Sequence, residues 1–181
     1  MPMPFVIGRD FCGEIIEVGR NVRHFKIGER VWSNCQGIQN QQGTFAQFLA
    51  VNPATIFPLP SDVDPIAAVG AFHSAFTAIL GLTREAELKV DDVLFVHGGA
   101  GSEALLPIGD LYTKDASIRG FAITNASLTE TQQAALQINQ LLAQHAIKTK
   151  IAQKLPLSEA REAHRLMEKD EIWGKIILEI P

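Results

Sequence analysis

The sequence predicts an α/β protein in which a β-rich region precedes a glycine-rich loop and two amphipathic helices. Short apolar stretches between glycines occupy the first sixty residues, a pattern that is typical of a small barrel. An apolar run at residues 93–96 leads into three closely spaced glycines, as in a dinucleotide-binding turn. The 181 residues are enough for one domain of ordinary size with a real hydrophobic core.

Charge and cysteine content narrow the possible classes of function. The net charge of -4 and the absence of a Lys/Arg cluster argue against nucleic acid as a partner. We find no uninterrupted apolar run of membrane-spanning length and no secretion signal, so the sequence predicts a cytoplasmic protein without a membrane partner. Cys12 and Cys35 lack the spacing of a zinc knuckle, and two structural thiols are the simpler interpretation.

The first half of the chain contains strand signals and one strong helix signal. Residues 12–19 and 28–32 are expected to form strands, residues 43–51 alternate loosely, and the prolines of residues 52–62 end the pattern. Asp64 followed by Pro65 predicts a helix start, and the helix should end near Gly81. Because this helix is apolar nearly all round, we expect it to be buried between two layers.

The second half predicts a strand, two helices and a final strand. Residues 116–123 are expected to form a strand. Ser127 and Glu130 form a capping-box signature before an apolar series at helical spacing, Leu128, Ala135, Ile138 and Leu142. A shorter helix should begin with Ser158 as its cap, and residues 173–180 should close the chain as a strand.

The glycine-rich loop does not fully match a nucleotide-binding turn. Such a turn needs a helix after it, because the first helical N–H groups hold the phosphate charge. Here Pro107 and Gly109 follow within one or two turns, and Glu103 places a negative charge near any phosphate. The loop could therefore bind a dinucleotide or be a plain turn.

Several stretches, in this order, resemble landmarks of the medium-chain dehydrogenase/reductases. The closest resemblance is to the zinc-independent quinone oxidoreductases, the zeta-crystallin-like branch. Nearly the whole chain takes part, so the ordered set is more specific than the glycine loop alone. The stretches are residues 4–32, 43–51, 67–80, 90–102, 111–123 and 155–178.

The resemblance implies a GroES-like β-barrel catalytic domain with a strongly truncated Rossmann-like element. Residues 1–63 would form the first part of the barrel, residues 64–126 a remnant of the nucleotide-binding domain, and residues 127–181 the C-terminal helices and the strand that returns to the barrel. The family has a leading segment before the residues that resemble its first landmark. The further βα units of the family would have to fit into residues 102–115. These residues are too few for even one βαβ unit. We therefore expect a large internal deletion relative to the family.

The resemblance also implies NADPH as the cofactor and a set of residues that would bind it. Ser74 corresponds to a position near the nicotinamide end, although a hydroxyl bonded back to its own helix explains it equally well. For His97, at the end of the strand, a structural histidine is favoured over an acid-base role. The implied cofactor-binding residues are Ser74, His97, Gly98, Gly99, Ala100, Gly101 and Ser102.

The resemblance gives no support for a metal site. Arg9 stands where zinc-dependent relatives have a ligating histidine, and a guanidinium cannot give up its proton to coordinate a metal. We therefore expect no zinc. Arg9 and Asp10 are expected to form a local ion pair near the mouth of the barrel.

Two functions from different classes remain open at this point. The first is an oxidoreductase of the NADPH:quinone reductase type, which transfers hydride to a quinone or an activated alkene, in a homodimer as in the family. The second is a non-catalytic GroES-like fragment or assembly module that lacks a working cofactor domain. The sequence identifies no catalytic residue, so whether this chain is an enzyme is left undecided.

Overall fold

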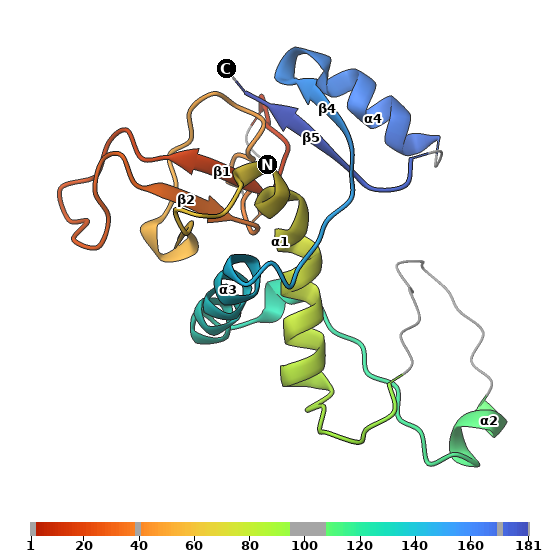
Figure 1. Ribbon diagram of the computed structural model, residues 1–181. Coiled ribbons are helices and arrows are strands. Elements are labelled where there is room, and N and C mark those ends of the chain that lie inside the picture. Colours follow the sequence, from red (N-terminus) through yellow and green to blue (C-terminus); the bar gives the residue numbers. More distant parts are fainter. Residues whose placement is uncertain (1–2, 39–40, 95–107, 170–171, 181) are drawn as a thin grey trace.

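The computed structural model contains two separate small sheets joined by helices (Figure 1). The first sheet is antiparallel, with strand order β1-β2-β3. It consists of β1 (Phe11–Glu14), β2 (Arg30–Ser33) and β3 (Phe57–Pro58). The structure describes residues 3–38, 41–94, 108–169 and 172–180.

The second sheet is a parallel pair, β4 (Ile151–Pro156) and β5 (Lys175–Glu179). A crossover through α4 (Ala160–Glu168) joins the two strands, as parallel pairing requires. Figure 1 shows this unit beside the N-terminal end of α1. The final strand is confirmed, but the sequence did not predict β4.

Helix α1 (Pro65–Leu80) connects the two sheets. It begins where the sequence predicts, because the Asp64 carboxylate accepts hydrogen bonds from the backbone N–H groups of Ile66 and Ala67 at 3.3 and 3.1 Å. A wider turn, η2 (Gly81–Glu85), extends its last turn.

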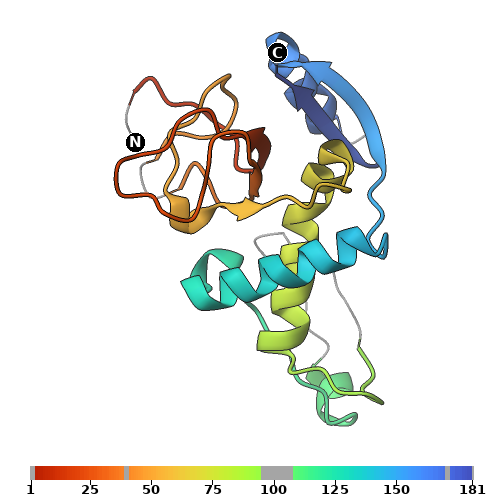
Figure 2. The same ribbon diagram turned by 60° about the vertical axis from the view of Figure 1, so that its left-hand side comes forward.

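Helix α3 (Leu128–Ala143) crosses α1, as Figure 2 shows. Its capping box is confirmed: the Ser127 hydroxyl accepts from the Glu130 N–H, and the Glu130 carboxylate accepts from the Ser127 N–H. Between these helices and the first sheet lies the hydrophobic core, in which the Trp32 and Phe72 rings stack at 3.8 Å. Ile138 of α3 is fully buried in this core.

The predicted barrel is not closed in the described part of the chain. The first sheet has strands of only four, four and two residues, and no strand of the second sheet pairs with it. Residues 43–51 form no strand. The backbone groups that close a barrel are therefore not paired here, and the fold is better described as a small open sheet and a parallel pair.

Two predicted strands beside the glycine loop are wrong where the structure describes them. Val93 is 100% exposed and Leu94 is 46% exposed, and neither lies in a strand. Residues 116–122 also lie in no strand, and they lead into the short turn η3 (Ile123–Asn125). Apolar, β-prone residues form a strand only when a neighbouring strand accepts their hydrogen bonds, and no described strand is available to them.

The expectation that α1 is buried between two layers is wrong along one side of the helix. Ala67, Ser74 and Ala78 are exposed along one side of the helix. The stretch Pro65–Glu85 is long and apolar enough to cross a membrane by length and composition alone, and 33% of its most apolar window is buried. The side that faces the core contains Ala68, Gly70, Ala71, Phe72, Phe76 and Leu80.

The last helix is confirmed, but its cap is not Ser158. Ser158 lies inside a single 3-10 turn, η4 (Leu157–Glu159), and the residue at the start of α4 makes no capping hydrogen bond through its side chain. The 3-10 turn satisfies the first N–H groups of this helix without a hydroxyl.

Candidate functional site

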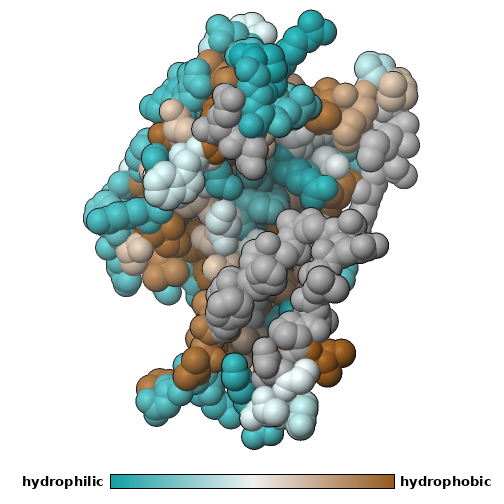
Figure 3. Space-filling view, turned by 90° about the vertical axis from the view of Figure 1, so that its right-hand side faces the viewer, coloured by the Kyte–Doolittle hydropathy of each residue, from teal (hydrophilic) through white to brown (hydrophobic). Residues whose placement is uncertain are grey.

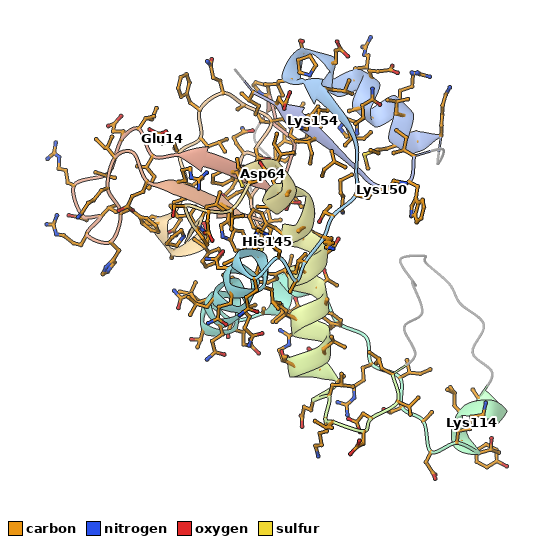
Figure 4. The ribbon with its side chains drawn as sticks, in the orientation of Figure 1. Glu14, Asp64, Lys114, His145, Lys150 and Lys154 are labelled. Atoms are coloured by element: carbon orange, nitrogen blue, oxygen red, sulfur yellow. The ribbon has the colours of Figure 1, made fainter. Side chains whose placement is uncertain are left out.

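A polar cluster lies where the first sheet meets α1. Phe11 pairs with Ser33, so the same register places Asp10 opposite Asn34 at the end of the sheet. His73 projects from α1 toward this end, and its Nδ1 lies 3.8 Å from Oδ1 of Asp10. Figure 4 shows the start of α1, marked by Asp64, beside the first sheet.

Burial sets the protonation of this cluster. It raises the pKa of Asp10 to about 6, against the opposing effects of the Lys175 and Arg9 charges. Burial also lowers the pKa of His73, and Lys175 and Arg9 lower it further. The pKa of Asp10 therefore lies closer to neutral pH than that of an ordinary carboxyl group, as it does for carboxyl groups that act as general acids or bases.

Two buried polar atoms of the cluster have no hydrogen-bond partner among the described residues. They are Oδ1 of Asp10 and Nδ2 of Asn34. The backbone around them is held firmly, since the Thr44 hydroxyl donates to the Asp10 carbonyl oxygen at 2.9 Å. Buried unpaired polar atoms are uncommon in folded proteins, and they occur at sites kept for chemistry or for a water molecule.

The predicted ion pair between Arg9 and Asp10 is not formed in the described part of the chain. The Asp10 carboxylate approaches His73 instead, and Arg9 acts on it only through its charge. The sequence contains no signal for the contact with His73, because the two residues belong to elements whose packing is set by the whole core.

Most of the predicted cofactor-binding residues lie outside the described residues. This holds for His97, Gly98, Gly99, Ala100, Gly101 and Ser102. Ser74 is described, and it lies on the exposed side of α1. These predictions therefore stay predictions.

The described residues on either side of the loop do not fit a dinucleotide pocket of the usual kind. Such a pocket needs a buried strand before the loop and a helix after it. Val93 is instead fully exposed, and the helix that follows, α2 (Ile108–Tyr112), has five residues. The only parallel pair that the structure describes, β4 with β5, lies elsewhere in the chain.

Metal ligands are sparse in the described residues. No group of three or more His, Cys, Asp and Glu side chains is placed there to hold a metal ion. The absence of zinc stays a prediction that rests on Arg9.

Two surface hollows lie apart from the polar cluster. One, of about 590 Å³, lies between residues 21–25, β3 and α3. The other, of about 430 Å³, lies beside Phe48. Neither hollow is lined by Asp10 or His73, so the polar cluster lies in neither of them.

Two known protein families match successive parts of the chain. Residues 1–61 match the alcohol dehydrogenase GroES-like domain, and residues 71–178 match the zinc-binding dehydrogenase family. A GroES-like part followed by such a domain defines the medium-chain dehydrogenase/reductase class. The second match covers more than half of this chain. The chain therefore belongs to the zinc-binding dehydrogenase family.

The curated relatives are considerably longer than the region they share with this chain. An L-threonine 3-dehydrogenase of Rhizobium rhizogenes is 29% identical over 149 residues, which cover 69% of this chain and 41% of that protein. An L-threonine 3-dehydrogenase of Shewanella baltica is 29% identical over 123 residues, with 55% and 35% covered. The chain thus spans about two fifths of the length of the curated relatives it matches.

Solved structures share the fold. An NAD-dependent alcohol dehydrogenase has a TM-score of 0.81 at 17% identity, with 100% of this chain and 84% of that chain covered. The quinone oxidoreductase of Escherichia coli complexed with NADPH has a TM-score of 0.78 at 16% identity, with 97% and 82% covered. At such low identity the likeness establishes the fold alone.

Proposed function

We propose that the chain forms the substrate-side part of an NADPH-dependent oxidoreductase of the quinone reductase type, with a quinone or an activated alkene as the acceptor. The observation that supports this proposal is Arg9 at the head of β1. A guanidinium at this landmark cannot act as a zinc ligand, which favours the zinc-independent branch. The likeness in fold to a quinone oxidoreductase agrees with it.

The polar cluster gives this function a source of protons. Reduction of a quinone to a hydroquinone consumes a proton along with each hydride. Asp10, whose pKa is raised to about 6 by burial, can release a proton near neutral pH and regain it from water. His73 Nδ1 lies 3.8 Å from Oδ1 of Asp10, which is beyond hydrogen-bond distance, so proton exchange between them would need a bridging water molecule.

The nucleotide-binding part is not formed by the described residues. The proposal therefore requires that residues outside the described part, or another chain, hold NADPH. For this reason binding of the nucleotide must be tested before turnover.

The test is a titration of the folded chain with NADPH, followed by nucleotide fluorescence and heat. Saturable one-to-one binding with a Kd of about 1–100 µM supports the proposal. Gly101→Val should abolish it by blocking close approach of the loop backbone to the phosphates, whereas Gly109→Ala in α2 is the matched control. NADPH-dependent reduction of a quinone is then measured, and its absence despite binding would remove the reductase function.

A second candidate function is a non-catalytic GroES-like module. Full exposure of Val93 and the shortness of α2 favour it, since both argue against a Rossmann sheet in the described part. The same titration distinguishes the two. No binding at millimolar NADPH, with an intact fold, would support the module and contradict the enzyme.

A further inference from the structure

Two cationic side chains lie beside the polar cluster. We define the cationic pair as Arg9, at the head of β1, and Lys175, the first residue of β5. Within the described part of the chain, neither side chain forms an ion pair. By contrast, Lys154 of β4 approaches Glu179 to 3.9 Å. The charges of the cationic pair are therefore left for another partner.

The position of Lys175 follows from the packing of α1 on β5. A Cβ atom placed on Gly70 of α1 would lie 3.7 Å from Cδ1 of Ile177 and 2.8 Å from Cδ1 of Ile151. Ile151 pairs with Lys175, and Ile177 lies two residues further along β5 on the same side of the strand. His73 follows Gly70 by three residues and so lies on the same side of α1. Lys175 is therefore on the side of β5 that faces α1, and its charge acts on His73.

Arg9 approaches the polar cluster from the first sheet. Its carbonyl oxygen accepts from the Gln36 N–H at 3.1 Å, which holds the backbone next to Asp10 in place. The Arg9 side chain is exposed, and its charge acts on both Asp10 and His73. Figure 1 shows the first sheet and β5 on either side of the start of α1. The two members of the cationic pair thus come from two different sheets.

The local charge is opposite in sign to the charge of the whole chain. The chain carries a net charge of -4. At the polar cluster, Arg9 and Lys175 are positive, whereas Asp10 supplies at most one negative charge because burial raises its pKa to about 6. Burial also lowers the pKa of His73, so this side chain is neutral at neutral pH. A site with a net positive charge attracts an anion.

The site is open to a small molecule. The side chains of His73 and Asp10 are 40% and 30% exposed, and Arg9 is exposed as well. A guanidinium and an ammonium group each donate charge-assisted hydrogen bonds to a carboxylate. Figure 3 shows mainly hydrophilic residues over the upper part of the molecule, where the second sheet and α4 lie, and apolar residues lower down. An anionic group therefore suits this end of the molecule better than an apolar one.

We propose that the acceptor carries a carboxylate, which Arg9 and Lys175 bind while the group to be reduced lies at Asp10 and His73. This inference rests on the proposed function, and it narrows the acceptor from any quinone or activated alkene to one with an acidic substituent. Both cations act on both members of the polar cluster. The carboxylate therefore has to stand close to the reducible carbonyl group in the acceptor.

The test uses the product of such a reduction, so that binding needs neither NADPH nor turnover. Gentisate is the hydroquinone of a carboxylated benzoquinone, and its methyl ester is the neutral counterpart. Titration calorimetry of the full chain should give a Kd of about 10 µM to 1 mM for gentisate. The ester should bind at least about tenfold more weakly, because it lacks the charge that both cations recognise. Added salt should weaken the binding of gentisate and leave that of the ester unchanged.

Substitutions locate the carboxylate. Arg9→Gln and Lys175→Gln should each weaken the binding of gentisate about tenfold and leave the weaker binding of the ester unchanged, because each removes one charged donor. Lys175→Arg keeps the charge and should retain most of the affinity. Lys26→Gln, at an exposed lysine between β1 and β2, is the matched control and should change neither Kd. Circular dichroism verifies the fold, and Arg9→Gln at an exposed side chain decides the matter even where Lys175→Gln is unstable.

Three outcomes would overturn the inference. Equal Kd values of the wild type for gentisate and its ester would show that the carboxylate is not recognised. A preference for gentisate that survives in Arg9→Gln and in Lys175→Gln would place the carboxylate elsewhere. Inorganic pyrophosphate that displaces gentisate and binds more tightly through the same two side chains would assign the cationic pair to the phosphates of a nucleotide.

These outcomes are distinguishable from a failure of the proposed function, which the NADPH titration decides. If NADPH binds and neutral quinones are reduced as fast as carboxylated ones, the chain is a reductase and this inference is wrong. If gentisate binds as expected and NADPH does not bind, the anion site stands, and its assignment to an acceptor fails together with the proposed function.

Discussion

His73 of α1 and Asp10 at the head of β1 approach each other to 3.8 Å between Nδ1 and Oδ1. Lys175 of β5 acts on both through its charge. The two sheets and the helix that joins them therefore meet at a small group of titratable side chains. The protonation of this group affects the stability of the contact between them.

Replacing the Asp10 carboxylate should stabilise the protein at high pH. Because the folded-state pKa of Asp10 is raised from 3.8 to about 6, the folded state binds more protons than the unfolded state between these values. The contribution of Asp10 to the free energy of unfolding therefore falls as pH rises from about 4 to about 6. Asp10→Asn should be more stable than the wild type at pH 8 by on the order of 1–3 kcal/mol.

The measurement is urea denaturation of both proteins from pH 4 to pH 8. The gain from Asp10→Asn should be full above about pH 6 and shrink as pH falls toward the unfolded-state pKa of 3.8, because the folded-state carboxyl is then already protonated. His73 has the opposite dependence, since a lowered folded pKa costs stability as pH falls below about 6.5. Because the two residues lie 3.8 Å apart, Asp10→Asn is also compared in a His73→Gln background, which removes the titration of the histidine. Asp62→Asn, at an exposed carboxylate, is the control, and a gain that did not vary with pH would contradict the assignment.

Asn139 should be the most sensitive polar residue of α3. Its Oδ1 accepts from Nε1 of Trp32 at 2.9 Å, and its Nδ2 donates to the Pro58 carbonyl oxygen at 2.9 Å. Asn139→Ala leaves the Nε1–H of fully buried Trp32 without a partner, at a cost of about 1–3 kcal/mol of unfolding free energy. Asn139→Asp keeps the acceptor and should lose less. Gln140→Ala, at an exposed side chain, is the control. Equal losses of unfolding free energy in Asn139→Ala and Gln140→Ala would contradict the role of Asn139 as the partner of Trp32.

The two predicted helix caps should differ in their effect on stability. Ser127→Ala removes a hydroxyl that accepts from the Glu130 N–H, and should cost about 1 kcal/mol. Ser158→Ala should be nearly neutral, because Ser158 caps nothing in the structure. Thermal unfolding of the two variants side by side tests this difference. A larger loss at Ser158 would show that α4 begins earlier than described.

Local signals in the sequence predicted the helices well. Asp64 with Pro65, and Ser127 with Glu130, act within one turn of chain, so their effect depends little on the rest of the fold. The capping prediction failed at Ser158, where a 3-10 turn performs the same role.

Strands were harder to predict because each needs a partner that its own residues do not specify. Residues 116–123 have strand-like composition and form none, while β4 has a less regular pattern and pairs with β5. The polar cluster could not be predicted for the same reason. Neither Asp10 nor His73 is unusual in the sequence, and only the packing of α1 on the first sheet brings them together.

Both cysteine thiols should react slowly with a disulfide reagent in the folded protein. For Cys12 the rate should be about a hundredfold or more below the rate in the unfolded chain. Burial raises the pKa of Cys12 to about 12 and also raises that of Cys35, so little reactive thiolate exists at pH 8. The Cys35 thiol also donates to Oδ1 of Asn34 at 3.2 Å. Cys12→Ser and Cys35→Ser each leave one thiol, whose modification by a chromogenic disulfide can be followed with and without urea. Modification of Cys12 at the same rate in both conditions would show that the contact between β1 and α1 opens freely in the native state.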